Sequence, residues 1–338
     1  MSYTLFDRER IIQGSLGERK NKVKIEQAYI RVDAPDPDIP ATVREQIART
    51  AEYILDARAK DRSVMLSFGA HSIKNGLGPL MVKMLERGWI THLATNGAGI
   101  IHDWEFAFLG ESSESVAENL PAGHFGIWDE TGKYLNLAII AGAHNGLGYG
   151  ASVGRAICDG GINIPPEDEL LREIKGGDGA AADLLSTIRK GEIAPGWLPI
   201  PAPYGRFSLQ AGAWRLGIPS TDHPMFGHDI IYTHPLNCGQ AIGRAAGRDF
   251  RTFARSMENL SGGVYLSLGS AIMSPMVFSK ASAMLQKPVK GHHITVVDLA
   301  KPAWSRHFEE SAPSSLDFLT LDNRDFLLCL YHQLDEND

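Results

Sequence analysis

The segment Leu93–Asp103 constrains the fold more than any other part of the chain. It starts as an apolar run, passes into a Gly/Asn cluster and ends on a His-Asp pair, reading Leu-Ala-Thr-Asn-Gly-Ala-Gly-Ile-Ile-His-Asp. A second segment, Ser63–Gly76, has the same form. Such runs are typical of buried parallel strands, whose carboxyl ends carry ligand groups at one edge of an α/β sheet. We therefore expect two successive strand-loop-helix units that share a binding edge.

Most of the chain alternates between strand and helix patterns. Strands are expected at Val64–Phe68, Trp89–Thr95, Gly217–Ser220, Asp229–Thr233, Val264–Leu268 and His293–Leu299. Helices are expected at Ala41–Ala59, Gly78–Arg87, Ser113–Glu118, Asp129–Ala143, Gly148–Cys158, Asp178–Lys190, Phe250–Asn259 and Pro275–Leu285, with one more ending at Leu216. This alternation predicts an α/β fold with a doubly wound, mostly parallel, Rossmann-like sheet and helices on both faces.

The 338 residues are expected to divide unequally. Residues 1–60 read as an N-terminal helical appendage, because a charged start and a Pro/Asp cluster precede the first amphipathic helix. Residues 61–338 read as a single α/β domain. Gly and Pro pairs frame an irregular excursion at 159–204, which suits a surface or subunit-contact arm.

Composition excludes several classes of partner. The net charge is −7 and no Lys/Arg-rich block occurs, so nucleic acid is not an expected partner. No apolar stretch reaches the ~18 residues of a membrane helix, which predicts a cytoplasmic protein that does not contact membranes. The three cysteines, Cys158, Cys238 and Cys329, lie far apart and predict core thiols rather than a disulfide framework or zinc site.

Ionisable residues follow many of the expected elements. They are His71, His102, Asp103, His144, Asp222, His223, His228 and Asp229. A histidine beside an aspartate can act as a general base near neutral pH, so His102, Asp103, His228 and Asp229 are the candidate catalytic residues. Three structural roles are the alternatives. The histidines could be surface or capping residues, Asp103 could cap a helix, and Asp229 could close a loop.

The glycine-rich loops are candidate cofactor sites. Small residues and free backbone N–H groups near a helix start suit phosphate oxygens. The candidates are His71, Asn75, Gly76, Thr95, Asn96, Gly97 and Gly99. Neither loop has the GxGxxG pattern with an acid ~20 residues later, so tight turns are the alternative explanation for the glycines.

A metal site is the second alternative at the same loops. His223 and His228, with Asp222 and Asp229, could place imidazole and carboxylate donors together, which would suit a metal-assisted hydrolase. No HExxH pattern or cysteine pair supports that arrangement, and we predict no metal.

Three local patterns resemble the deoxyhypusine synthase family, which includes plant-type homospermidine synthases and uncharacterised bacterial relatives. The first runs from Met65 to Asp103, where the family reads roughly T-T-A-G-G-V-E-E-D and this chain keeps Thr95, Gly99 and Asp103 with His102 in place of an acid. The second is Ala213–Tyr232, and the third is Gly263–Ile272. The resemblance implies a deoxyhypusine synthase-like fold that binds NAD, and a homotetramer with active sites at dimer interfaces.

Departures from the family pattern weigh against deoxyhypusine synthesis. Ser274 stands where the family has the lysine that forms an imine, and a hydroxyl cannot form a Schiff base. Gly217 replaces a family histidine, and the family's C-terminal cofactor segment is absent. We therefore expect an NAD-binding transferase or oxidoreductase acting on an amine- or amino-acid-type small molecule, as a dimer or tetramer. The alternatives are the metal-assisted hydrolase and a non-catalytic ligand-binding protein of the same fold.

Overall fold

A computed structural model describes residues 3–121, 123–301 and 303–338. Its centre is a six-stranded sheet in which every neighbouring pair of strands is parallel, in the order β10-β9-β8-β2-β3-β7. The strands are β2 (Val64–Phe68), β3 (His92–Thr95), β7 (Ser220–Asp222), β8 (Val264–Leu268), β9 (His293–Asp298) and β10 (Ser315–Thr320). The expected parallel α/β sheet is confirmed.

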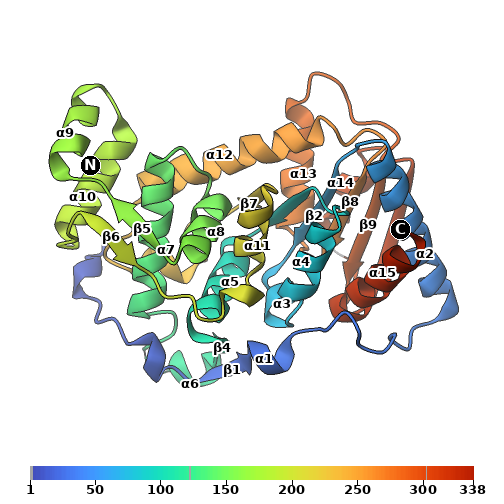
Figure 1. The fold of residues 1–338 in the computed structure, drawn as a ribbon, viewed down its shortest axis with the longest axis horizontal. Coiled ribbons are helices and arrows are strands. Elements are labelled where there is room, and N and C mark those ends of the chain that lie inside the picture. Colours follow the sequence, from blue (N-terminus) through green and yellow to red (C-terminus); the bar gives the residue numbers. More distant parts are fainter. Residues whose placement is uncertain (1–2, 122, 302) are drawn as a thin grey trace.

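Helices cover both faces of this sheet (Figure 1). Side chains that alternate along a strand point to opposite faces, so Leu66 packs into one core and Met65 into another. The core around Leu66 is closed by α2 (Ala41–Ala59), α4 (Gly78–Glu86) and α15 (Asn323–Asn337). The core around Met65 is closed by the C-terminal half of α12 (Gly239–Met257), α13 (Met273–Met284) and α14 (Arg306–Glu309). The sheet is therefore doubly wound.

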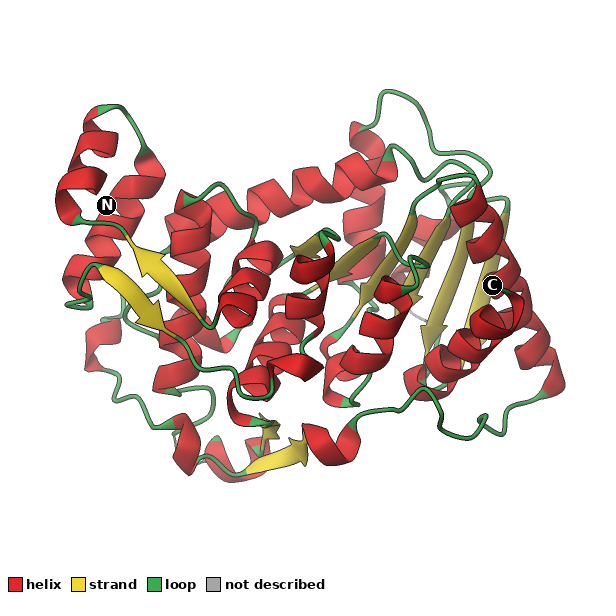
Figure 2. Ribbon diagram, in the orientation of Figure 1, coloured by secondary structure: helices red, strands yellow, loops and turns green. Residues whose placement is uncertain are grey.

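A third core lies outside the sheet, in a helical lobe that occupies the left half of Figures 1 and 2. Its helices are α5 (Gly97–Leu109), α7 (Asp129–His144), α8 (Tyr149–Asp159), α9 (Glu167–Lys175), α10 (Gly179–Lys190) and α11 (Leu209–Leu216). The long helix α12 joins the lobe to the sheet, because Ile242 near its start is buried in the lobe core and Phe253 near its end is buried against the sheet.

Short elements complete the fold. Strand β1 (Asn21–Lys24) pairs antiparallel with β4 (Glu111–Glu114), and β5 (Gly161–Ile164) pairs antiparallel with β6 (Gly196–Pro199). The remaining helices are α1 (Ile25–Ala28), α3 (Ala70–Lys74) and α6 (Val116–Asn119). Single 3-10 turns lie at η1 (Arg8–Arg10), η2 (Leu16–Glu18), η3 (Gly205–Phe207), η4 (Ile230–Thr233) and η5 (Ala303–Ser305).

Several sequence expectations were wrong. The apolar run expected as a strand at Asp229–Thr233 forms the 3-10 helix η4, whose Ile231 is buried in the lobe core. A run this short carries no periodicity that separates strand from helix. The stretch expected as a helix at Ser113–Glu118 is the end of β4 followed by α6. Strand β10 and helix α15 were not expected at all, and only Cys329 of the three cysteines is buried.

The N-terminal residues and the excursion are more ordered than their composition indicates. Ile47 and Ile54 of α2 are fully buried in the main core, so this helix packs on the sheet. Residues 159–204 hold the β5–β6 pair and two helices. The division of the chain at residue 60 stays a prediction.

Candidate functional site

The chain reverses its direction of travel across the sheet between β2 and β8. The strands after β2 in the chain, β3 and β7, lie on one side of it, whereas β8, β9 and β10 follow one another on the other side. In open parallel sheets, ligands bind outside the carboxyl ends of the strands at such a reversal. Here the backbones approach closely, because a Cβ on Gly69 would overlap the carbonyl group of Gly269. Glycine at position 69 therefore lets the ends of β2 and β8 lie in direct backbone contact.

The first cavity lies at this junction and measures about 210 Å³. Its walls come from four parallel strand ends: His71 and Asn75 after β2, Gly269 after β8, Asp298 and Leu299 at β9, and Asp322 and Asn323 after β10. Asp322 is already engaged, because it caps α15 and pairs with Arg324. The Asp298 carboxylate accepts only the Leu299 N–H, at 2.8 Å, among the described hydrogen bonds. An acidic side chain at a strand end is the group that holds ribose hydroxyls in dinucleotide-binding sheets.

The first cavity fits one part of a dinucleotide. Its volume is below the roughly 300 Å³ at which sites for drug-sized ligands begin, so it suits a nucleoside-sized group rather than an entire NAD molecule. The Asp298 carboxylate and the Asn75 carboxamide supply the polar groups that a ribose or nicotinamide needs. The residues present therefore fit the nucleoside end of the cofactor that the family resemblance implies.

The second cavity, of about 220 Å³, shares helix α3 with the first, because His71 and Lys74 are three residues apart and lie on neighbouring parts of one helix face. It is lined by Lys74 of α3, His102 of α5, and His228 and Asp229 of the loop after β7, with Phe125 and Val116 as apolar wall. Three of the four predicted catalytic residues thus line one cavity. The two cavities share α3, and the charges of His71 and Lys74 both lower the pKa of His102.

His102 is held in one tautomer by a hydrogen-bond chain. Glu105 is buried and forms a two-pronged ion pair with Arg19, at 2.8 and 2.6 Å. The Ser112 hydroxyl donates its single proton to Glu105 at 2.6 Å, so it can only accept from His102 Nδ1, which lies 2.6 Å away. The proton therefore sits on Nδ1 and Nε2 carries a free lone pair. Burial lowers the pKa of His102 to about 4, against the opposing charge of Glu105, so the ring is neutral at pH 7.

Asp229 faces the start of α5. A Cβ on Gly97 would overlap the Asp229 carboxylate, so the glycine lets this group sit against the first turn of the helix, whose dipole attracts negative charge. Oxygen Oδ2 of Asp229 is buried and has no hydrogen-bond partner in the described structure. Burial raises the pKa of Asp229 to about 6, with Tyr232 and His228 opposing the rise.

Behind Asp229 lies a group of buried acids and phenols. Asp222, at the carboxyl end of β7, is 0% exposed, and neither of its carboxylate oxygens has a partner among the described residues. The hydroxyl groups of Tyr149 and Tyr232 are also buried and without a partner there. Burial and the charges of Asp229 and Asp249 raise the pKa of Asp222 well above its usual value. We call Asp222, Asp229, Tyr149 and Tyr232 the acid cluster.

Asp103 does not belong to this group. Its buried carboxylate accepts hydrogen bonds from the Ser208 hydroxyl at 2.6 Å and from the N–H groups of Leu209 and Gln210 at 2.8 and 3.1 Å. These donors form the start of α11, so Asp103 caps that helix instead of lining either cavity. Adjacent helix residues point about 100° apart, which is why Asp103 faces away from His102.

The remaining loop candidates have packing contacts. The Thr95 hydroxyl donates to the Phe68 carbonyl at 3.0 Å, and a Cβ on Gly99 would overlap that hydroxyl. The Asn96 side chain caps α5 by accepting the Gly99 N–H at 3.0 Å. Gly76 lies against the backbone of Ala28. Of the seven predicted cofactor residues, only His71 and Asn75 line the first cavity.

Other predicted residues line neither cavity at the carboxyl edge of the sheet. His144 sits in the helical lobe and pairs with Glu173 at 2.6 Å. His223 contacts the Thr221 hydroxyl at 3.2 Å. Ser274, at the position of the family lysine, is fully buried, and its hydroxyl lies 3.0 Å from that of Tyr265. Within the described ranges, no three His, Cys, Asp or Glu side chains are grouped closely enough to hold a metal ion.

Sequence reasoning missed Lys74, Asp298, Tyr149 and Tyr232. Lys74 lies inside the predicted loop segment, between His71 and Asn75, so its position was a usable signal. It has no ion-pair partner among the described residues, and burial with the charge of Lys22 lowers its pKa. Tyr149 carried no signal, because it starts a helix in a different lobe and meets Asp222 only in the folded chain.

Searches for known relatives return solved structures alone, since no family model and no curated protein matches. AgrE in complex with ornithine and NAD+ is 16% identical over 91% of this chain and 34% of its own, with a TM-score of 0.48. A "conserved putative LOR/SDH protein" from Methanococcus maripaludis S2 is 13% identical over 97% of this chain and 76% of its own, with a TM-score of 0.46.

A "putative deoxyhypusine synthase" from Entamoeba histolytica also matches, at 10% identity over 87% of this chain and 89% of its own, with a TM-score of 0.43. The family suspected from the sequence is thus represented among the structural matches. The chain spans about a third of the length of AgrE. The low identities and TM-scores of these matches assign no function to the chain. None of the helices in the described ranges combines the length and apolar character needed to cross a membrane.

Proposed function

We propose that the protein binds NAD at the carboxyl edge of its sheet and acts, as an oxidoreductase or transferase, on an amine- or amino-acid-type small molecule. The observation that supports this proposal is a pair of cavities that share α3, one at the reversal point of the sheet and one lined by Lys74, His102 and Asp229. Cofactor and substrate would occupy neighbouring sites that share this helix.

His71, Asn75 and Asp298 would hold the cofactor. Asp298 would accept hydrogen bonds from ribose hydroxyls, and the Asn75 carboxamide would pair with a polar ring edge. When bound, NAD supplies a hydride acceptor for the carbon that carries the amine.

The second cavity presents opposite charges to an amino acid. Asp229 would bind the ammonium group, and its raised pKa lets it also exchange a proton near neutral pH. Lys74, which has no ion-pair partner in the described ranges, would bind the carboxylate. His102 Nε2 would accept a hydrogen bond from the amine, because its ring is neutral and the proton sits on Nδ1, whereas Asp229, whose pKa is higher, would take the proton that the amine loses.

The cofactor part is tested by calorimetry with NAD+ and the full chain. We expect saturable binding that Asp298→Asn weakens at least tenfold, since a carboxylate to hydroxyl hydrogen bond is lost. Asp168→Asn is the matched control, because Asp168 is an exposed acid on α9 in the other lobe. No binding by the unmodified protein, or equal binding by both variants, would overturn NAD as the cofactor.

The substrate part is tested with a panel of lysine, ornithine, arginine and spermidine, followed by NADH absorbance. We expect turnover of at least one compound, and its loss in Gly97→Ala, whose methyl group displaces Asp229. Gly243→Ala is the control, because a Cβ there meets no atom within 4 Å. NAD binding without turnover of any amine would favour the non-catalytic alternative, as would mass spectrometry that finds only the cofactor on the native protein.

A separate experiment tests whether a lysine at position 274 would permit the imine step of deoxyhypusine synthesis. Ser274 is packed against Tyr265 in a core, so a lysine introduced there is not expected to reach the second cavity. The Ser274→Lys protein should therefore form no borohydride-stable adduct with an aminobutyl donor such as spermidine in the presence of NAD+.

A further inference from the structure

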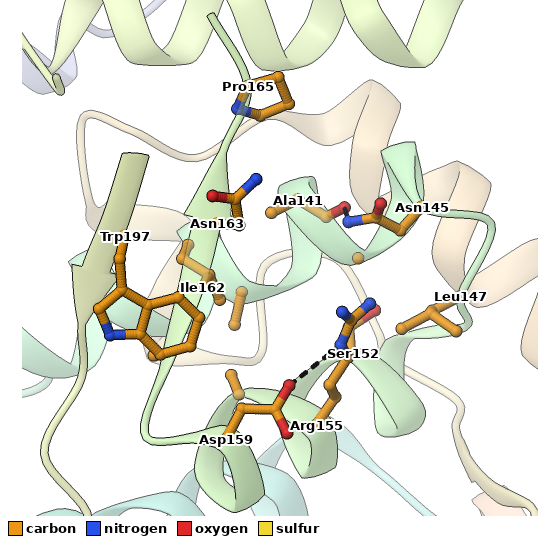
Figure 3. A pocket seen from close by; sticks show the side chains of 14 residues that line it. Ala141, Asn145, Leu147, Ser152, Arg155, Asp159, Ile162, Asn163, Pro165 and Trp197 are labelled. Atoms are coloured by element: carbon orange, nitrogen blue, oxygen red, sulfur yellow. Dashed lines mark hydrogen bonds and ion pairs between the residues drawn. The ribbon is translucent and has the colours of Figure 1, made fainter. Parts of the chain in front are cut away.

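A third cavity, of about 130 Å³, lies in the helical lobe and has no residue in common with the two at the sheet edge. Figure 3 shows it between Trp197 on one side and Asn145, Leu147 and Arg155 on the other. Three separate parts of the chain build it: the end of α7, the helix α8 and the β5–β6 pair. The proposed cofactor and substrate sites do not use it.

The walls combine an uncovered aromatic ring with small residues. Trp197 is 55% exposed, although its ring also lies over Gly161, where a Cβ would meet the indole. Ala138, Ala141 and Ala156 line the interior without filling it. A large aromatic face beside a small hollow is typical of ligand sites, because it offers much contact area at little cost in side-chain entropy.

The polar groups of this cavity carry both charges. Arg155 Nε donates to the Asp159 carboxylate at 3.2 Å, and Figure 3 marks this contact. The two terminal nitrogens of Arg155 have no partner among the described hydrogen bonds, and neither has the Asn163 carboxamide. A guanidinium group binds a carboxylate through two parallel N–H donors. The neighbouring Asp159 would repel a simple anion but attract an ammonium group.

We propose that this cavity is a second binding site, for a small zwitterionic amino acid. Arg155 binds the carboxylate, Asp159 binds the ammonium group, and Trp197 covers the aliphatic part. At about 130 Å³ the cavity is well below the roughly 300 Å³ at which sites for drug-sized ligands begin, so we expect it to take glycine, alanine, serine or proline rather than arginine or a nucleotide. The inference does not depend on the proposed function at the sheet edge.

The test uses the full chain labelled with ¹⁵N and titrated separately with glycine, alanine, serine, proline and arginine. The indole N–H signal of Trp197, assigned through Trp197→Phe, reports the site. We expect it to shift with at least one of the four small amino acids in the millimolar range or below, and not with arginine. Arg155→Met should weaken this binding at least tenfold, as expected for a charge-assisted pair.

Arg172→Met is the matched control. Arg172 forms an i,i+4 ion pair with Asp168 at 2.7 Å in the same lobe, and it lies outside the cavity. Asp229→Asn is the second control, since binding at the sheet edge would be sensitive to it. No indole shift with any small amino acid would overturn the proposal. The same holds if binding survives Arg155→Met or is lost in Asp229→Asn.

Discussion

Two carboxylates beside helix starts, the buried Asp103 and the half-buried Asp229, differ in their hydrogen bonds. Asp103 receives three hydrogen bonds from the Ser208 hydroxyl and the first residues of α11 and lines neither cavity at the sheet edge. Asp229 lies against the first turn of α5, lines a cavity and keeps one buried oxygen without a partner in the described structure. A satisfied carboxylate stabilises the fold, whereas an unsatisfied one costs stability that a ligand can restore. Hydrogen-bond satisfaction, rather than position at a strand or helix end, separates the two roles.

The sharpest test of this contrast is Asp103→Ala. The substitution leaves the Ser208 hydroxyl and two backbone N–H groups of α11 unpaired in the interior, so we expect a loss of roughly 2–4 kcal/mol of unfolding free energy. Urea denaturation followed by circular dichroism measures it. Asp229→Asn should lose far less, and an equal loss in both variants would erase the distinction.

Asp222→Asn tests the other side of the comparison. The raised pKa of Asp222 means that the folded protein binds this proton more tightly than the unfolded chain. The folded state therefore loses stability relative to the unfolded state as pH rises above about 3.8, the ordinary value. Asparagine cannot ionise, so the variant should be more stable than the parent by about 1–2 kcal/mol at pH 8 and equal to it near pH 4. A destabilised variant at pH 8 would mean that the carboxylate is paired.

A smaller effect is expected in the pH dependence of ligand binding. Asp229 holds an ammonium group only when ionised, and its pKa is about 6, so affinity for the amine should fall about tenfold between pH 7 and pH 5. His102 is neutral down to about pH 4 and should add no step near 6.5. Calorimetry across this range checks both statements. In Asp229→Asn the profile should be flat, and a step that persists there would assign the titration to another group.

The sequence predicted the sheet well because its strands are continuous apolar runs. Val64–Phe68 and Val264–Leu268 are buried along their whole length, as expected for continuous apolar runs, and both were predicted to the residue. Helix α2 was also predicted to the residue, although its burial against the sheet was not. Strand β10 was not predicted, because Ser315–Thr320 is mostly half-buried and its sequence has no continuous apolar run.

The sequence indicated residues of the candidate site only where they follow the strands that it also predicted. His71, Asn75, His102 and Asp229 belong to segments that follow parallel strands, and the predicted sheet brings such segments together at one edge. The difference between Asp103 and His102 could not be foreseen, because it depends on which side of α5 meets α11. The acid cluster needs Tyr149 from the helical lobe, and no local pattern links that residue to β7.

Helix α12 makes the two lobes inseparable. Its first half supplies Ala241, Ile242 and Ala245 to the lobe core, and its second half supplies Phe253 and Met257 to the core behind the sheet. Unfolding either core would therefore expose the apolar face of one half of α12, while the other half is still packed in the other core. The chain should lose both lobes in one cooperative transition, so neither half is suited to production as a separate fragment.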